Sequence, residues 1–305
     1  MKAIICTGYG VPDVLMLQEI EKPTPKSNQI LIKIHATTVT SGDCVVRGAK
    51  QYGPIMKIMF GFKRPRQPIL GTEFSGIIEE VGENSTKFKV GDAVFALTGM
   101  KFGGYAEYIC LPENAIVSLA PRNATFEETA TLAFGGTTAL HFLRKASLAP
   151  NQKVLIYGAS GSVGAAAIQL ATYFGADVTG ICSTQNLEFV HSLGANTTID
   201  YTTEEFNTLD KTYDIVFDAV GKLNKSKRKQ LTSKNGKFVS VSKGMVKGLV
   251  EDLYLLKELV EKERFKATID RTYSLANAAQ AHEYVETGRK KGNVALTVTN
   301  NYTLP

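Results

Sequence analysis

The spacing of apolar and polar residues changes near residue 125, which predicts two regions of different architecture. Before this point, short apolar runs are separated by Gly and Pro, a pattern typical of an all-β barrel or sandwich. After it, apolar runs alternate with segments of helical period, which indicates βαβ units around a parallel sheet. We therefore expect an α/β chain whose two regions fold differently.

The expected elements are short and closely spaced. In the first region, strands are expected at residues 1–8, 30–35, 74–81, 93–97 and 105–111. In the second, helices are expected at 126–143 and 161–174, and strands at 154–157, 177–181, 213–219 and 238–241. The chain closes with a predicted helix at 275–288 and a strand at 294–298. The apolar run at the start is too short for a signal peptide.

Composition excludes general disorder and gives no sign of a membrane protein. The chain has 305 residues, of which 44% are hydrophobic and 21% charged, enough apolar side chain to form a core. The apolar stretch 154–184 contains one charge, but glycines interrupt it, so we do not expect a membrane span. The four cysteines lie far apart without a CxxC, as expected of reduced thiols in the cytoplasm.

The basic character of the chain comes from one segment. The net charge is +6, and residues 222–237 hold seven basic side chains and no acid. Without this segment, basic and acidic residues nearly balance, so we do not expect a nucleic-acid partner. We expect a surface helix here, with Leu223 and Leu231 on one buried face and the lysines in water. A second hypothesis is electrostatic attraction of a polyanionic dinucleotide.

Residues 154–164 (VLIYGASGSVG) predict a dinucleotide site, because an apolar strand runs through a glycine turn into a helix. Gly161 lets the backbone approach a pyrophosphate, and Gly164 permits close packing of the helix on the strand. The start of the helix offers free N–H groups to phosphate oxygens. Ala159 stands at the first glycine position of the GxGxxG fingerprint.

The end of the next strand favours NADPH over NADH. NAD sites usually place an acidic residue there, about 20 residues on, but no carboxylate precedes Glu188. Ser183 and Thr184 would instead accommodate an adenosine 2′-phosphate. Alternatively, Thr184 is the N-cap of a helix starting near Gln185, and both roles can hold.

Further short motifs appear in a fixed order along nearly the whole chain. They are 71–76 (GTEFSG), 81–82 (VG), 90–94 (VGDAV), 103–108 (GGYAEY), 138–139 (TA), 158–164 (GASGSVG), 192–195 (SLGA), 199–201 (IDY), 217–221 (FDAVG) and 291–294 (KGNV). Together they resemble the medium-chain dehydrogenases/reductases, specifically the zinc-independent quinone oxidoreductase-like branch. The resemblance implies a GroES-like β-barrel domain, residues 1–121 with 270–305, and a doubly wound Rossmann domain, residues 122–269.

The resemblance also implies a cofactor site in a cleft between these domains. It assigns the pyrophosphate to residues 160–163, the adenosine phosphate end to Ser183 and Tyr201, and the nicotinamide half to Thr138, Val220 and Asn293. The full expected set is Thr138, Gly158, Ser160, Gly161, Ser162, Val163, Ser183, Thr184, Tyr201, Val220 and Asn293. For Tyr201, packing of a strand-end aromatic ring is the alternative. NADH stays possible, because similar enzymes often carry Lys where this chain has Gln185.

The resemblance implies that zinc is absent. In the alcohol dehydrogenase branch, a catalytic Cys lies three residues before an Asp, and a His precedes a Glu in the GHE motif. Here those positions hold Thr40, before Asp43, and Thr72, before Glu73. Threonine is not a usual zinc ligand. We expect the histidines to be surface imidazoles and the cysteines to be packed thiols. No Ser-His-Asp or Cys-His arrangement competes as catalytic machinery.

Hydride transfer without a metal suits quinones and α,β-unsaturated carbonyls, because conjugation spreads the developing charge. Tyr52 is the predicted proton donor, with Thr40 beside it; ordinary loop packing is the alternative for both. Enoyl thioesters or aldehydes are alternative substrates, and a non-catalytic NADPH-binding redox sensor is an alternative of another class. A homodimer is possible, although the edge that pairs subunits in the family is shortened here to residues 243–249.

Overall fold

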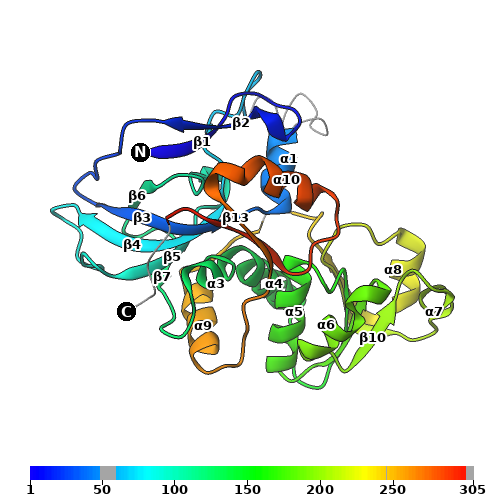
Figure 1. Cartoon of the computed structure of the whole chain (residues 1–305). Coiled ribbons are helices and arrows are strands. Elements are labelled where there is room, and N and C mark those ends of the chain that lie inside the picture. The colour runs from blue at the N-terminus through cyan, green and yellow to red at the C-terminus, as the bar shows by residue number, and fades with distance from the viewer. Residues whose placement is uncertain (49–59, 245, 300–305) are drawn as a thin grey trace. The chain divides into compact units, whose positions relative to one another are not determined.

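The computed structural model describes residues 1–48, 60–244 and 246–299 (Figure 1). The chain divides into two compact units. The first comprises Met1–Phe134, Leu253–Glu261 and Ile269–Pro305, and the second comprises Gly135–Asp252 and Lys262–Thr268. Within the described ranges, no helix combines the length and the apolar character needed to cross a membrane.

The first unit is built on antiparallel strands. Strands β1 (Lys2–Cys6) and β2 (Leu15–Glu19) pair with each other. A larger sheet has the order β13-β14-β3-β4-β5-β7, with β6 also pairing β3. Its strands are β3 (Gln29–Thr38), β4 (Glu73–Val81), β5 (Ala93–Leu97), β6 (Tyr108–Pro112), β7 (Val117–Leu119), β13 (Ile269–Ser274) and β14 (Asn293–Thr297).

Alternating apolar positions give this sheet its core. Ile30, Ile32 and Ile34 of β3 are fully buried and belong to one cluster with Phe74 and Ile78 of β4. The period of two sends these side chains to the same face of the sheet. The C-terminal strand β14 pairs antiparallel with β3, so the end of the chain completes the N-terminal sheet.

Helices of the first unit are short. They are α1 (Ser41–Gly48), α3 (Phe126–Ala130), α10 (Ala278–Glu286) and α9 (Val250–Glu261), which belongs to this unit from Leu253 on, together with the 3-10 helices Pro12–Val14, Gly99–Lys101 and Leu275–Asn277. The single helix expected at 126–143 was wrong, because α3 ends before α4 (Ala133–Lys145) begins. Thr131 separates them: both its N–H and its hydroxyl bind the Glu128 carbonyl, a local bond that competes with the helical ladder.

The second unit confirms the predicted parallel sheet. Its strand order is β10-β9-β8-β11-β12, and every pairing is parallel. The strands are β8 (Lys153–Tyr157), β9 (Asp177–Cys182), β10 (Thr197–Asp200), β11 (Tyr213–Asp218) and β12 (Thr232–Ser240). Because the chain runs outward from β8 to β10 and then returns to β11, the carboxyl ends of β8 and β11 form the topological switch point where doubly wound sheets bind ligands.

Helices of this unit follow their strands in turn, in the green and yellow part of the ribbon (Figure 1). They are α4 from Gly135 on, α5 (Ser162–Tyr173), α6 (Leu187–Ser192), α7 (Glu204–Thr208), α8 (Lys225–Leu231) and the 3-10 helix Thr184–Asn186. The α/β class, with a largely antiparallel sheet in one unit and a doubly wound parallel sheet in the other, is thereby confirmed.

The basic segment 222–237 differs from the solvated helix that the sequence suggested. Only its middle forms α8, and β12 already begins at Thr232. Leu231 is buried and Leu223 packs on the same cluster, as expected. Lys227, however, is buried: its amine donates to the Asn207 carbonyl at 3.0 Å and lies 4.9 Å from the centre of the Phe206 ring. In the described part of the chain, β12 pairs only with β11 and so forms a sheet edge.

Candidate functional site

The turn between β8 and α5 has the geometry of a nucleotide-binding turn. Gly158 has φ +80°, a left-handed conformation that favours glycine. A Cβ on Gly164 would lie 2.1 Å from the Gly158 carbonyl oxygen, so helix and strand can approach only without a side chain there. A Cβ on Gly161 would have no heavy atom nearer than 3.6 Å, which leaves space beside the start of α5.

A buried carboxylate shapes the neighbouring loop after β11. Asp218 accepts the backbone N–H groups of the next loop through both of its oxygens, at 2.8–3.3 Å from residues 220–223. The Ser240 hydroxyl lies at 3.4 Å from the same carboxylate. This loop places Val220 against Gly158. A Cβ added to Gly158 would lie 2.6 Å from Val220 Cγ1. Asp218 was not among the expected site residues, although it belongs to the FDAVG motif.

At the ends of β9 and β10, the structure contradicts the alternative role of Thr184 as a helix N-cap. The hydroxyl of Thr184 donates to the Asp200 carboxylate and does not cap a helix. Asp200 also accepts the N–H and hydroxyl of Thr202, at 2.8 and 2.7 Å. The Thr184 hydrogen bond is the largest cause that lowers the pKa of Asp200. A carboxylate therefore does lie beside Thr184. It belongs to Asp200 of the adjacent strand β10, so the sequence of residues 180–186 gave no sign of it.

Ser160 and Ser183 share a partner that the sequence did not reveal. The side-chain nitrogen Nδ2 of Asn186 donates to both serine hydroxyl oxygens at 3.2 Å. Asn186 is buried, whereas both serines are half-buried. Asn is a common N-cap residue directly before a helix, so its presence there gave no sign that its side chain binds Ser160 and Ser183.

The other expected cofactor residues occupy several elements. Ser162 and Val163 begin α5, and Thr138 is buried in α4. Tyr201 follows β10 and is half-exposed, with its ring centre 6.2 Å from that of Tyr157. Asn293 begins β14 in the first unit.

In the first unit, Thr40 is bound closely to Asp43. The Thr40 hydroxyl donates to Asp43 Oδ2 at 2.6 Å, and its N–H donates to the same oxygen at 2.9 Å. The N–H of Gly71 donates to Asp43 Oδ1 at 3.1 Å. Burial raises the pKa of Asp43 to about 6. The hydroxyl proton of Thr40 is therefore already engaged, and Tyr52, the other predicted proton donor, lies outside the described residues.

Glu73 is a second fully buried carboxyl group in this unit. Its oxygens accept the hydroxyl of Thr38, at 2.5 Å, and the N–H of Phe134. Burial raises the pKa of Glu73 to about 8, and the nearby Asp43 adds to this effect. Thr72, beside it in the sequence, is also buried, and its hydroxyl has no partner within the described residues.

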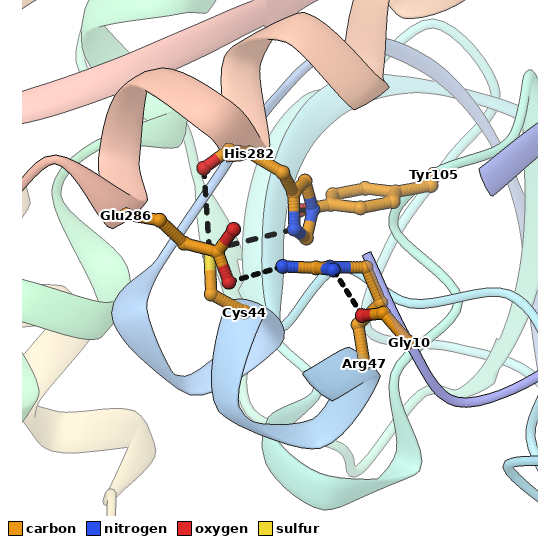
Figure 2. A network of polar contacts seen from close by, with 6 residues as sticks. All are labelled: Gly10, Cys44, Arg47, Tyr105, His282 and Glu286. Carbon is orange, nitrogen blue, oxygen red and sulfur yellow. Dashed lines mark hydrogen bonds and ion pairs between the residues drawn. The ribbon is translucent and has the colours of Figure 1, made fainter. Parts of the chain in front are cut away.

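A buried Cys–His contact joins two helices of the first unit (Figure 2). Cys44 of α1 and His282 of α10 lie 238 positions apart, yet Cys44 Sγ is 3.4 Å from His282 Nδ1. The other ring nitrogen, Nε2, is 3.0 Å from the hydroxyl of Tyr105. Burial lowers the pKa of His282 to about 3 and raises that of Cys44 to about 12. Both groups therefore stay neutral near pH 7, so the thiol is no nucleophile.

The same helices hold a buried guanidinium group. Arg47 of α1 is 1% exposed and donates to the Gly10 carbonyl and to Glu286 of α10 (Figure 2). His282 and His35 are both buried, so the expectation of surface imidazoles was wrong for these two residues.

Comparison with known proteins agrees with this architecture. Residues 26–121 match the family model of the alcohol dehydrogenase GroES-like domain, and residues 162–295 match that of the zinc-binding dehydrogenases. The chain is 34% identical to 2-methylene-furan-3-one reductase of Solanum lycopersicum, covering 97% of this chain and 79% of the relative. The chain belongs to the medium-chain dehydrogenases/reductases, in the quinone oxidoreductase-like branch. A nicotinamide cofactor is typical of this superfamily.

Two further members of the superfamily support the assignment. The NADPH-dependent alkenal/one oxidoreductase of Arabidopsis thaliana chloroplasts is 31% identical, over 97% of this chain and 79% of the relative. The solved structure of the quinone oxidoreductase from Coxiella burnetii superposes with a TM-score of 0.87 and 28% identity, covering 98% of this chain and 99% of that one.

Two positions that hold zinc ligands in the alcohol dehydrogenase branch are Thr40 and Thr72 in this chain. Among the described residues, no three His, Cys, Asp or Glu side chains are grouped so that they could hold a metal. The segments outside the description, 49–59, 245 and 300–305, contain none of these four residue types.

Proposed function

We propose that this protein is an NADPH-dependent reductase of quinones or α,β-unsaturated carbonyls that works without zinc. The observation that carries the proposal is the glycine turn at the switch point of the parallel sheet, in a chain whose relatives are named as alkenal and quinone reductases. Their names also give the substrate class: both kinds of substrate are conjugated carbonyls.

The proposed cofactor residues are those that the superfamily motifs imply. Residues 160–163 would hold phosphate oxygens through the start of α5, and Ser183 and Tyr201 would hold the adenosine end. Val220, Thr138 and Asn293 would hold the nicotinamide half. When bound, NADPH supplies the hydride. The chain's own contribution is to bind and orient the cofactor. The proton donor proposed for the reaction is Tyr52, with Thr40 as a neighbour.

The hydrogen bonds of the carboxyl groups near Thr40 and Thr72 support independence from zinc. The two carboxyl groups there, Asp43 and Glu73, are fully buried and accept hydrogen bonds from threonine hydroxyls and backbone N–H groups. Burial raises the pKa of both groups, and the positive charge of Lys290 partly offsets this rise for Glu73.

The test is consumption of NADPH with a panel of quinones and enals, with an enoyl thioester and a simple aldehyde as competing substrates. We expect turnover of conjugated carbonyls, unchanged after treatment with a zinc chelator. Activity lost on chelation and restored by zinc would disprove zinc independence. Micromolar NADPH binding with no turnover of any substrate would favour the non-catalytic redox sensor.

The remaining parts of the proposal concern organisation and location. We assign residues 1–121 and 270–305 to the substrate domain and residues 122–269 to the cofactor domain. The four cysteines are free, which agrees with a reducing, cytoplasmic setting. Because β12 forms a sheet edge with no further strand in the described residues, a homodimer of the usual family type is in doubt.

A further inference from the structure

We infer that Asn186 is a positioning residue of the nucleotide site, which orients the hydroxyls of Ser160 and Ser183 so that both donate to the 2′-phosphate of NADPH. The inference rests on the proposed function, because it assumes that a nicotinamide dinucleotide binds at the carboxyl ends of β8 and β9. Neither the superfamily motifs nor the printed sequence assigns a role to this asparagine.

One amide nitrogen joins the two serines. Ser160 lies in the turn after β8, and Ser183 directly follows β9, the adjacent strand. Nδ2 of Asn186 is 3.2 Å from the hydroxyl oxygen of each. Because both oxygens contact the same nitrogen, they lie close enough together for a single phosphate group to accept from both.

The direction of these hydrogen bonds leaves the serine hydrogens available. A hydroxyl has one hydrogen to donate, and an oxygen that accepts from Asn186 must point its hydrogen elsewhere. Within the described ranges, neither serine donates to another residue. Both side chains are half-buried, so a ligand can reach them. Two outward O–H donors form a site suited to an anion.

The side chain of Asn186 does not cap the helix that follows it. It occupies the N-cap position of α6, where an Asn side chain usually accepts a backbone N–H. Here it makes no such bond, and its Oδ1 has no partner among the described residues, although the side chain is 5% exposed. The amide is therefore committed to the two serines and not to the helix.

Thr184 provides a matched contrast. It lies next to Ser183, but its hydroxyl hydrogen is donated to Asp200, so it cannot be donated to a phosphate.

The test is equilibrium titration of NADPH, NADH, 2′,5′-ADP and 5′-ADP with the full chain. A hydrogen bond to a charged group affects affinity by about tenfold or more. We expect Ser160→Ala, Ser183→Ala and Asn186→Ala each to weaken NADPH and 2′,5′-ADP about tenfold, with little change for NADH and 5′-ADP. The matched control is Ser192→Ala, which removes an exposed hydroxyl of α6 that donates to the Phe189 carbonyl and should keep the preference for the 2′-phosphorylated ligands.

A combined variant separates positioning from a general loss of structure. If Asn186 acts through the serines, adding Asn186→Ala to the Ser160→Ala/Ser183→Ala variant should not weaken NADPH further. A full additional loss, or an unchanged preference in Asn186→Ala, would overturn the inference. Should Asn186→Ala fail to fold, an unchanged preference in the double serine variant overturns it equally. Binding needs no turnover, so a protein that binds NADPH but reduces nothing refutes only the proposed function.

Discussion

Gly161 and Gly164 are two of the three glycines in residues 158–164, and their replacement by alanine should have different effects. A methyl group at Gly164 would lie 2.1 Å from the Gly158 carbonyl oxygen and 2.8 Å from the Cα of Ala159. Both are backbone atoms, so no side-chain rotation relieves the clash. Overpacking of this kind costs about 1–3 kcal/mol, and we expect Gly164→Ala to reach the upper end, about 3 kcal/mol.

Gly161→Ala is the matched control within the same turn. Its methyl group would meet nothing within 3.6 Å, and φ −80° suits any residue, so the stability change should stay within about 1 kcal/mol. The same methyl group would occupy the space proposed for the pyrophosphate, so the Kd for NADPH should rise at least about tenfold.

Thermal unfolding without cofactor and NADPH titration distinguish the two variants. A loss of about 3 kcal/mol corresponds to a Tm lower by about 6–12 °C, expected for Gly164→Ala and not for Gly161→Ala. The reasoning is refuted if Gly164→Ala unfolds at the wild-type temperature, or if Gly161→Ala binds NADPH as tightly as the wild type.

Three further predictions follow from buried and exposed charges. Burial lowers the pKa of His282 from 6.5 to about 3, so between these pH values only the unfolded chain binds this proton. As the pH falls from 6.5 to 3, the free energy of unfolding of the wild type, measured with urea, should decrease by up to about 1.4 kcal/mol per pH unit. For His282→Gln the decrease should be smaller. Asp218→Asn puts an amide donor against loop N–H groups and should cost about 2 kcal/mol and weaken NADPH binding; equal stability and affinity would contradict its anchoring role. Replacing the exposed Lys222, Lys225 and Lys229 by Gln should slow NADPH association in stopped-flow at low salt, and an unchanged rate would leave no steering.

The sequence predicted those elements whose apolar residues form an uninterrupted pattern. Strands β5, β8 and β9 lie within a residue of the expected ends, because each is a buried apolar run bounded by polar or glycine residues. Strand β2 was missed because four of its five residues are exposed, so burial imposes no alternation. The first half of β12 was missed for the same reason, since its basic residues face solvent.

The candidate site was predicted where its residues are neighbours in the chain and missed where they are neighbours only in the sheet. The turn of residues 158–164 is local, so its glycines alone indicate its geometry. Asp200 reaches Thr184 through the pairing of β9 with β10, two strands separated by a helix. Cys44 of α1 and His282 of α10 are in contact although 238 positions separate them in the sequence. No spacing rule detects such contacts.

The position of Asp200 changes the basis for the expected NADPH preference without reversing it. An acid that selects NAD must offer its oxygens to the ribose hydroxyls. Both oxygens of Asp200 instead accept from residues of its own fold, Oδ2 from Thr184 and Oδ1 twice from Thr202, and the side chain is 4% exposed. Its charge is spread over three donors and screened from a ligand. Under the proposal above, preference for a 2′-phosphate would depend on the hydroxyls of Ser160 and Ser183 and not on Thr184.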